Sequence, residues 1–146
     1  MKAGLNLIEA SELLANNETS SVELTKFYLD NINKGEELNC YNTVSSEEAL
    51  KAAESSDKRR KEEKSKSRFD GIPIGIKDLF CTKNIKTTAS SKILSNFVPT
   101  YESTASQNCI NAGLISLGKL NCDEFAMGST NKTSYFGSVI NPWKSK

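Results

Sequence analysis

Residues 69–80 read Phe-Asp-Gly-Ile-Pro-Ile-Gly-Ile-Lys-Asp-Leu-Phe, and this stretch contains the pattern that decides the fold. Isoleucines that alternate with glycine and proline predict a short buried strand at Ile72–Lys77, and the two glycines leave room for close backbone approach. Lys77 ends this apolar strand, so one interpretation is that its side chain lies in apolar surroundings. An ammonium group there loses hydration, so its pKa falls from about 10.4 towards neutrality and the amine becomes usable as a base. The alternative interpretation of Lys77 is a strand-end lysine that extends into water.

The first 68 residues predict packing elements rather than chemistry. We expect a helix near Leu7–Ala15 and a second helix after the capping box Ser20-x-x-Glu23, in which hydroxyl and carboxylate satisfy free backbone donors. Gly35 is expected to end the second helix in a left-handed conformation. A strand at Cys40–Val44 and a helix that starts at a second capping box, Ser45-x-x-Glu48, complete this region.

After Lys77 the pattern predicts an irregular stretch, one helix and one more strand. The helix is expected at Thr104–Asn111, with Ser103 as its N-cap and Gly113 as its terminator. Leu114–Leu120 has the length of a strand and is the next predicted strand. The remaining residues, from Phe125 onward, are rich in Gly, Ser, Thr and Asn and are typical of a loop.

This order of elements indicates an α/β fold. We expect amino-terminal helices followed by the first part of a mixed, largely parallel sheet that is flanked by helices. The chain is expected to form part of one domain, with a helical region at residues 1–68 and the start of the sheet at residues 69–146. Lys77 then lies at the carboxyl end of its strand, the side where open α/β sheets place ligands.

Composition excludes several functional classes. The 146 residues carry a net charge of +1 and contain no histidine, so a histidine-based triad is excluded. The four cysteines form no Cys-x-x-Cys pair, which predicts reduced thiols and no metal site. No phosphate-binding glycine loop ends in Gly-Lys-Ser/Thr, so we expect no ATP site. Because Met1–Ile8 is too polar for a signal peptide and no membrane span is present, a cytoplasmic protein is expected.

A charged run extends from Asp57 to Arg68. It holds seven basic residues against three acidic ones. Such a run can contact phosphates, but it contains no aromatic residue for base stacking before Phe69, and acids are mixed into it. The second interpretation, a solvated helix end or linker, is the one we favour.

Several blocks of sequence in a fixed order resemble the opening of an amidase-signature enzyme. The blocks are Gly71–Asp78, Thr87-Thr88, Phe97-Val98-Pro99, Tyr101-Glu102-Ser103, Gly118–Ser129, Phe136-Gly137 and Asn141-Pro142-Trp143. Within that family, the run Asp123–Ser129 and the last two blocks are most similar to the A subunits of tRNA-dependent amidotransferases. The resemblance extends over nearly all of the chain but only over an opening portion of a family member.

The resemblance implies a catalytic role for Lys77. In the family, a nucleophilic serine is activated through a second serine that hydrogen-bonds a lysine, and Lys77 occupies the position of that lysine. Met127, Gly128 and Ser129 match the segment that lines the substrate site. The serines belong to a Gly-Gly-Ser-Ser-Gly-Gly-Ser segment and a later position, and the 146 residues contain neither. We therefore expect this chain to be inactive alone.

The resemblance also implies a substrate and partners. The A subunits hydrolyse glutamine and supply ammonia to mischarged Glu-tRNA(Gln) or Asp-tRNA(Asn), in complex with B and C subunits. No cofactor is expected in this chain, and ATP and Mg²⁺ are expected on the partner subunit. Any contact of this chain with tRNA is expected to be indirect. The segment with the serines is expected either in a longer polypeptide or in a separately encoded chain. Two alternatives stay open: part of a general amidase with another amide substrate, and a non-catalytic remnant or binding module.

Overall fold

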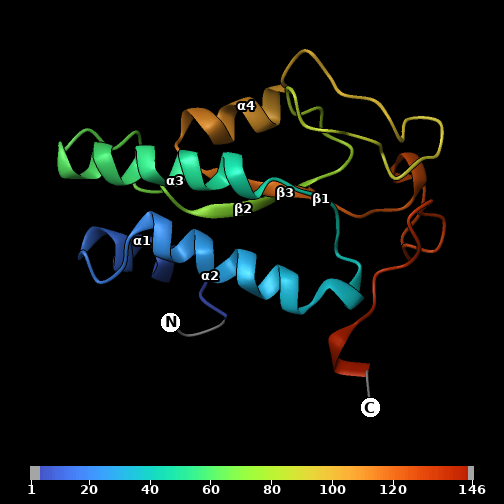
Figure 1. The fold of residues 1–146 in the computed structure, drawn as a ribbon, viewed down its shortest axis with the longest axis horizontal. Coiled ribbons are helices and arrows are strands. Elements are labelled where there is room, and N and C mark those ends of the chain that lie inside the picture. Colours follow the sequence, from blue (N-terminus) through green and yellow to red (C-terminus); the bar gives the residue numbers. More distant parts are fainter. Residues whose placement is uncertain (1–3, 145–146) are drawn as a thin grey trace. The chain divides into compact units, whose positions relative to one another are not determined.

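The computed structural model describes residues 4–144. Helices dominate the first half of the chain, and three short strands form one sheet (Figure 1). In chain order the elements are α1 Leu7–Ala15, α2 Ser21–Lys34, the 3₁₀ turn η1 Glu36–Leu38, β1 Tyr41–Val44, α3 Ser46–Lys61, β2 Pro73–Lys77, α4 Thr104–Asn111, β3 Ile115–Leu120, and the 3₁₀ turns η2 Glu124–Ala126 and η3 Pro142–Lys144. The predicted α/β class is confirmed. The helices α1 and α4 and the three strands are present within one or two residues of their expected ends, while α3, for which only the start was predicted, extends to Lys61.

The sheet is mixed and has the order β1-β3-β2. Strand β1 runs antiparallel to β3, with Tyr41 opposite Leu120. Strands β2 and β3 run in the same direction, because Ile115 N donates to Ile72 O at 2.9 Å and, further along both strands, Asp78 N donates to Leu120 O at 2.9 Å. The strand with Lys77 is therefore an edge of the described sheet, and the buried β3 is its centre.

The chain divides into two compact units. Unit 1 consists of residues 1–31, 45–74 and 107–117, and unit 2 of residues 32–44, 75–106 and 118–146. Helices α1 and α2 lie side by side in unit 1 (Figure 1), where its apolar core consists of Ala10, Leu14, Leu24 and Ile72. Both units draw residues from the predicted regions 1–68 and 69–146, and the assignment of those regions to one domain stays a prediction.

Two of the predicted helix signals are confirmed. At the start of α2, Glu23 N donates to Ser20 Oγ at 3.1 Å and Ser20 N donates to Glu23 Oε2 at 2.9 Å, which is the predicted capping box. The predicted N-cap of α4 also forms, because Ser106 N donates to Ser103 Oγ at 3.3 Å. Each cap gives a partner to a backbone donor that the first helical turn leaves free.

Two other signals were misread. Ser45 makes no side-chain cap, although α3 still begins there through the backbone bond from Ala49 N to Ser45 O. Gly35 has a φ of −106° and is not left-handed; the turn η1 follows it, and the left-handed residue is Asn39, with a φ of 56°. The hydroxyl of Ser45 therefore does not cap α3, and Gly35 does not adopt the left-handed conformation that would end α2.

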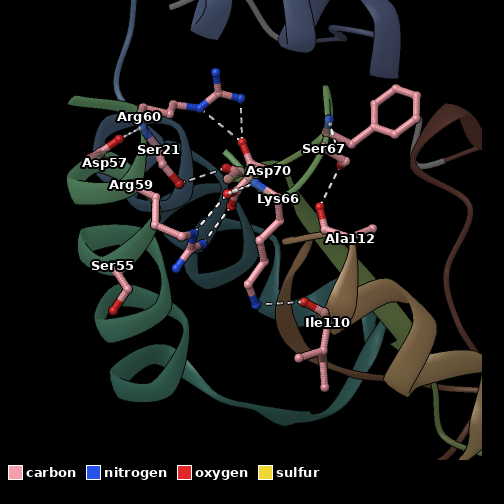
Figure 2. A network of polar contacts seen from close by, with 12 residues as sticks. Ser21, Ser55, Asp57, Arg59, Arg60, Lys66, Ser67, Asp70, Ile110 and Ala112 are labelled. Carbon is pink, nitrogen blue, oxygen red and sulfur yellow. Dashed lines mark hydrogen bonds and ion pairs between the residues drawn. The ribbon is translucent and has the colours of Figure 1, made fainter. Parts of the chain in front are cut away.

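The charged run after residue 57 folds onto one buried carboxylate. Asp70 is fully buried and accepts hydrogen bonds from Arg59 Nε at 2.9 Å, Arg59 Nη2 at 2.6 Å and the Lys66 backbone at 2.8 Å. Figure 2 shows Arg60 reaching the backbone oxygen of the same residue, while Lys66 and Ser67 extend to the end of α4. The run is a helix end, as we favoured, and Arg59 and Arg60 have a structural role.

This carboxylate remains ionised in the fold. Burial by itself would raise the pKa of Asp70, but the hydrogen bonds from Arg59 and the backbone of Lys66 outweigh it and hold the pKa below its usual range. Gly113, the predicted terminator of α4, has a φ of +88°, and a side chain there would collide with the Asp70 carboxylate. The ion pair of Arg59 and Asp70 therefore connects α3 with the segment before β2, and Gly113 packs against it. No helix within residues 4–144 is both long and apolar enough to span a bilayer.

Candidate active site

Lys77 ends β2 and its side chain is exposed. Among the described residues its side-chain amine makes no hydrogen bond or ion pair, so the expectation of a buried amine is wrong for this chain. The reason is the two-residue period of a strand: Ile76 and Asp78 are buried, and Lys77 is directed to the opposite face. No segment of residues 4–144 shields the amine from solvent at that position.

Asp78 anchors the chain immediately after Lys77. Its carboxylate is fully buried and accepts hydrogen bonds from Thr88 N at 3.1 Å, Thr88 Oγ1 at 2.5 Å and Asn42 Nδ2 at 2.8 Å. Its backbone oxygen accepts from Ala89 N at 2.9 Å. Asp78 therefore has a structural role, since its carboxylate and its backbone oxygen fix the chain at this point to Thr88, Ala89 and Asn42.

Two pairs of left-handed residues meet next to this anchor. Ala89 and Ser90 have φ values of 48° and 51°, and Phe125 and Ala126 have values of 51° and 57°. Phe125 N donates to Ala89 O at 2.9 Å, so the two pairs are joined. Left-handed conformations are unfavourable for residues other than glycine, and such strain is often found at functional sites. This observation points to the loop around residues 88–91 as part of a site.

The loop with the predicted substrate-lining residues is exposed. Met127 is 81% exposed, and Gly128 and Ser129 are also open to solvent. A Cβ atom on Gly128 would lie 2.5 Å from Asp123 Cγ, so a larger residue does not fit in this conformation. Gly128 therefore packs closely against the carboxylate of Asp123, and the role of residues 127–129 in lining a substrate site stays a prediction.

Asp123 fixes the shape of that loop. Its carboxylate accepts from Asn131 N at 2.8 Å, Thr133 N at 3.2 Å and Thr133 Oγ1 at 2.9 Å. These bonds, that from the Asn131 backbone first, lower the pKa of Asp123. The single turn η2 follows Asp123, and the Asp123 side chain makes no cap bond to it.

The structure connects the two predicted site segments indirectly. Ser91 Oγ donates to Glu124 Oε1 at 2.6 Å, and Tyr135 N donates to Ser90 O at 2.9 Å. The loop at residues 88–91 therefore links the segment after Lys77 with the segment around Met127. No hydrogen bond of the described residues joins Lys77 to residues 127–129.

Lys119 is the residue that sequence reasoning missed. It lies in β3, is 0% exposed, and donates hydrogen bonds to Thr82 Oγ1 at 2.9 Å, to Thr87 Oγ1 at 2.9 Å and to the backbone oxygen of Phe80. Burial lowers the pKa of Lys119, and the Asp78 carboxylate acts in the opposite direction. One signal was available: Lys119 lies between Leu117 and Leu120 in a predicted strand, and a lysine in a strand that becomes buried requires polar partners.

The chain belongs to the amidase family: a family model described as "Amidase" matches residues 23–146. It is 51% identical over 142 residues to the A subunit of the Pelagibacter ubique glutamyl-tRNA(Gln) amidotransferase. That match covers 94% of this chain and 28% of the relative. The predicted resemblance to the amidase-signature family, and within it to the A subunits, is confirmed.

Solved structures agree with this assignment. The peptide amidase of Stenotrophomonas maltophilia matches with a TM-score of 0.88 and 26% identity, over 97% of this chain and 31% of that protein. The A subunit of the Thermotoga maritima glutamyl-tRNA(Gln) amidotransferase matches with a TM-score of 0.74 and 27% identity, over 96% and 28%. The chain thus spans less than a third of the length of the proteins it resembles.

Proposed function

We propose that this chain is the amino-terminal part of the A subunit of a tRNA-dependent amidotransferase, which hydrolyses glutamine and passes the ammonia to mischarged Glu-tRNA(Gln) or Asp-tRNA(Asn). The observation that carries the proposal is the 51% identity to the A subunit of a glutamyl-tRNA(Gln) amidotransferase over 94% of the chain. By comparison, the peptide amidase, which has a similar fold, is only 26% identical to this chain. The expected setting is the cytoplasm.

Lys77 is the general base of this proposal. A neutral lysine can accept the proton of a bridging serine while that serine accepts the proton of the nucleophilic serine, and the lysine can later return a proton to the leaving ammonia. The 146 residues contain no Gly-Gly-Ser-Ser-Gly-Gly-Ser segment, so both serines must come from another segment. That segment would pack over the exposed face at Lys77 and exclude solvent from the amine.

The surface of unit 2 supports such packing. Large apolar side chains are exposed around the candidate site, among them Leu79 and Phe80 directly after Lys77, Ile93 at 83% exposure, and Met127. Large apolar side chains exposed in this number often mark an interaction site. We assign it to the serine-bearing remainder of the amidase domain, supplied by a longer polypeptide or by a separate chain. B and C subunits complete the proposed complex, with ATP and Mg²⁺ on the partner subunit.

A second candidate function is a general amidase. It is favoured by the TM-score of 0.88 to the peptide amidase, against 0.74 to the A subunit of the amidotransferase. Because both candidates use the same lysine and serines, only the substrate distinguishes them. The difference is therefore measured with glutamine against other primary amides.

Reconstitution tests the proposal directly. The 146-residue chain is mixed with the separately produced remainder of the A subunit from Pelagibacter ubique, together with the B and C subunits, and glutamate release from glutamine is measured. We expect activity from the mixture and none from either part alone. Glutamine hydrolysis by the 146-residue chain alone, or equal activity of a mixture that carries Lys77→Ala, would overturn the proposal. Hydrolysis of other amides but not glutamine would establish the general amidase instead.

A further inference from the structure

The buried ammonium of Lys119 binds the segment that follows Lys77. All three of its acceptors, the Phe80 carbonyl and the hydroxyls of Thr82 and Thr87, lie between three and ten residues after Lys77. A lysine ammonium has three donors, and each one has an oxygen partner here. Among the described residues no carboxylate forms a salt bridge with Lys119, so it is not held by an ion pair.

The Phe80 contact is the informative one. Phe80 N donates to Lys77 O at 3.0 Å, and the carbonyl of the same Phe80 accepts from Lys119. One residue further along β3, Leu120 O accepts from Asp78 N at 2.9 Å. The strand β3 therefore holds the turn that begins on Lys77 at both of its ends, through a backbone carbonyl and through a side-chain ammonium.

We propose that Lys119 is a positioning residue, which fixes the turn Lys77–Phe80 and thereby the backbone from which the Lys77 amine projects. The proposal rests on the function proposed above, in which Lys77 is the base. A base acts only within hydrogen-bond reach of its proton donor, so a small shift of its backbone reduces the rate strongly. Among the described residues Lys119 makes no hydrogen bond to the Lys77 amine, so it can act on that amine only through the turn.

An apolar side chain could fill the volume of Lys119 without the desolvation that a buried ammonium suffers. It could not hold three oxygens at one point. Thr82 and Thr87 are themselves buried, at 3% exposure each, so loss of the ammonium would leave their hydroxyls without this donor. The substitution Lys119→Met therefore removes the three bonds while it keeps the length of the side chain.

Amide hydrogen exchange on the 146-residue chain tests the proposal. With Lys119→Met, exchange at Phe80, whose amide binds Lys77 O, is expected to accelerate about tenfold, because bonds from a charged donor are lost. Exchange at Ala49, whose amide binds Ser45 O in α3, is expected to stay unchanged. The matched control is Lys83→Met, the same change at an exposed lysine of the same loop. Equal acceleration at Ala49, or none at Phe80, overturns the proposal.

A second variant covers the case in which Lys119→Met does not fold. Thr87→Val has the shape of threonine and removes one of the three acceptors, so it is expected to accelerate exchange at Phe80 by a smaller factor than Lys119→Met. An unchanged rate at Phe80 in Thr87→Val counts against the proposal. Lys119 itself is not altered in this variant, and a merely space-filling lysine would leave the amide unaffected.

The reconstituted enzyme provides the functional measurement. Lys119→Met is expected to lower kcat about a hundredfold while KM stays near that of the Lys83→Met control, since the base is displaced but the substrate site is not. Full activity together with lost protection at Phe80 overturns the positioning role. If Lys77→Ala leaves activity intact, the proposed function fails, whereas the exchange data still decide whether Lys119 holds the turn.

Discussion

The two units of the chain differ in how many large apolar side chains they expose to solvent. Among the described residues, the large apolar side chains exposed in unit 1 are Leu7, Ile8 and Ile110. Those exposed in unit 2 are far more numerous: Val44, Leu79, Phe80, Ile93, Phe97, Val98, Tyr101, Phe125, Met127, Tyr135, Val139, Ile140 and Trp143. Unit 1 packs its apolar residues internally, while unit 2 contains the site residues and leaves apolar surface uncovered.

The polar interiors of the units differ as well. Unit 1 contains the ion pair of Arg59 and Asp70. Unit 2 contains a buried carboxylate, Asp78, and a buried ammonium, Lys119, and each is bound by neutral hydroxyl, amide or carbonyl groups. The comparison teaches that unit 1 neutralises its buried charge within one ion pair, whereas unit 2 binds each buried charge with neutral groups and exposes more apolar side chains.

The largest expected effect concerns Lys77 in unit 2. Lys77→Ala in the reconstituted enzyme is expected to lower glutamine turnover by about a hundredfold to ten-thousandfold, the range that general-base assistance supplies. The exposed Lys83→Ala is the matched control, and the measurement is the initial rate of glutamate release. Because the side-chain amine of Lys77 makes no hydrogen bond or ion pair among the described residues, the free energy of unfolding of the 146-residue chain is expected to change little. A large loss of stability would show that Lys77 is structural.

The next effect concerns the buried ion pair of unit 1. Asp70→Asn is expected to lower the free energy of unfolding by about 3 kcal/mol, because it leaves Arg59 without its buried partner. Urea unfolding followed by circular dichroism measures it. The exposed pair Lys51 and Glu47, at 3.9 Å, gives the control: Glu47→Gln is expected to change stability by less than about 1 kcal/mol. Similar losses for both variants would contradict the buried role of Asp70.

Acid unfolding sharpens the same point. The pKa of Asp70 is lowered in the fold, so its contribution to stability is present above the unfolded value of 3.8 and is lost as the pH falls through the lower folded value. In Asp70→Asn this part of the acid dependence is expected to be absent, which a pH series of thermal unfolding below pH 4 would measure. An unchanged acid slope would show that Asp70 does not titrate in this range.

A smaller effect is expected where backbone conformation matters. Gly113→Ala combines a left-handed φ with a collision against Asp70, and is expected to cost about 2 kcal/mol. Gly4→Ala has a comparable φ of +84° but no neighbour within 4 Å, so it separates the strain of the backbone from the collision. Equal losses for the two variants would mean that the collision adds nothing.

The smallest change in stability is expected on the apolar surface of unit 2. Ile93→Ser removes a side chain that is 83% exposed and is expected to change the free energy of unfolding by less than about 0.5 kcal/mol. It is nevertheless expected to reduce self-association in sedimentation experiments and to weaken binding of the remainder. Leu7→Ser in unit 1 is the control and should affect neither property. Unaltered association in Ile93→Ser would remove this surface from the proposal.

Local pattern predicted the elements of the fold, because their signals are contained within short segments. The strand at Ile72–Lys77, the helix at Thr104–Asn111 and the capping box at Ser20 depend on neighbouring residues alone. Ser45 and Gly35 were misread because several backbone solutions suit the same residues, and contacts distant in sequence select among them.

The candidate site was predictable only in part. The resemblance placed a base at Lys77, but the burial of that amine depends on the surroundings of the strand and not on its sequence. Lys119 was overlooked because its partners are 32 to 39 residues away in the chain. Its position between Leu117 and Leu120 in a predicted strand was the one local sign that a buried polar cluster had to exist.

The position of β2 has a consequence for how a split enzyme would be made in the cell. Because the described sheet has the order β1-β3-β2, one long side of β2 has no neighbouring strand. An open side accepts strands from any chain that is present, including copies of the same product. If the remainder is a separate gene product, both polypeptides would have to be synthesised in matched amounts and meet soon after translation, since an excess of this one would pair with itself.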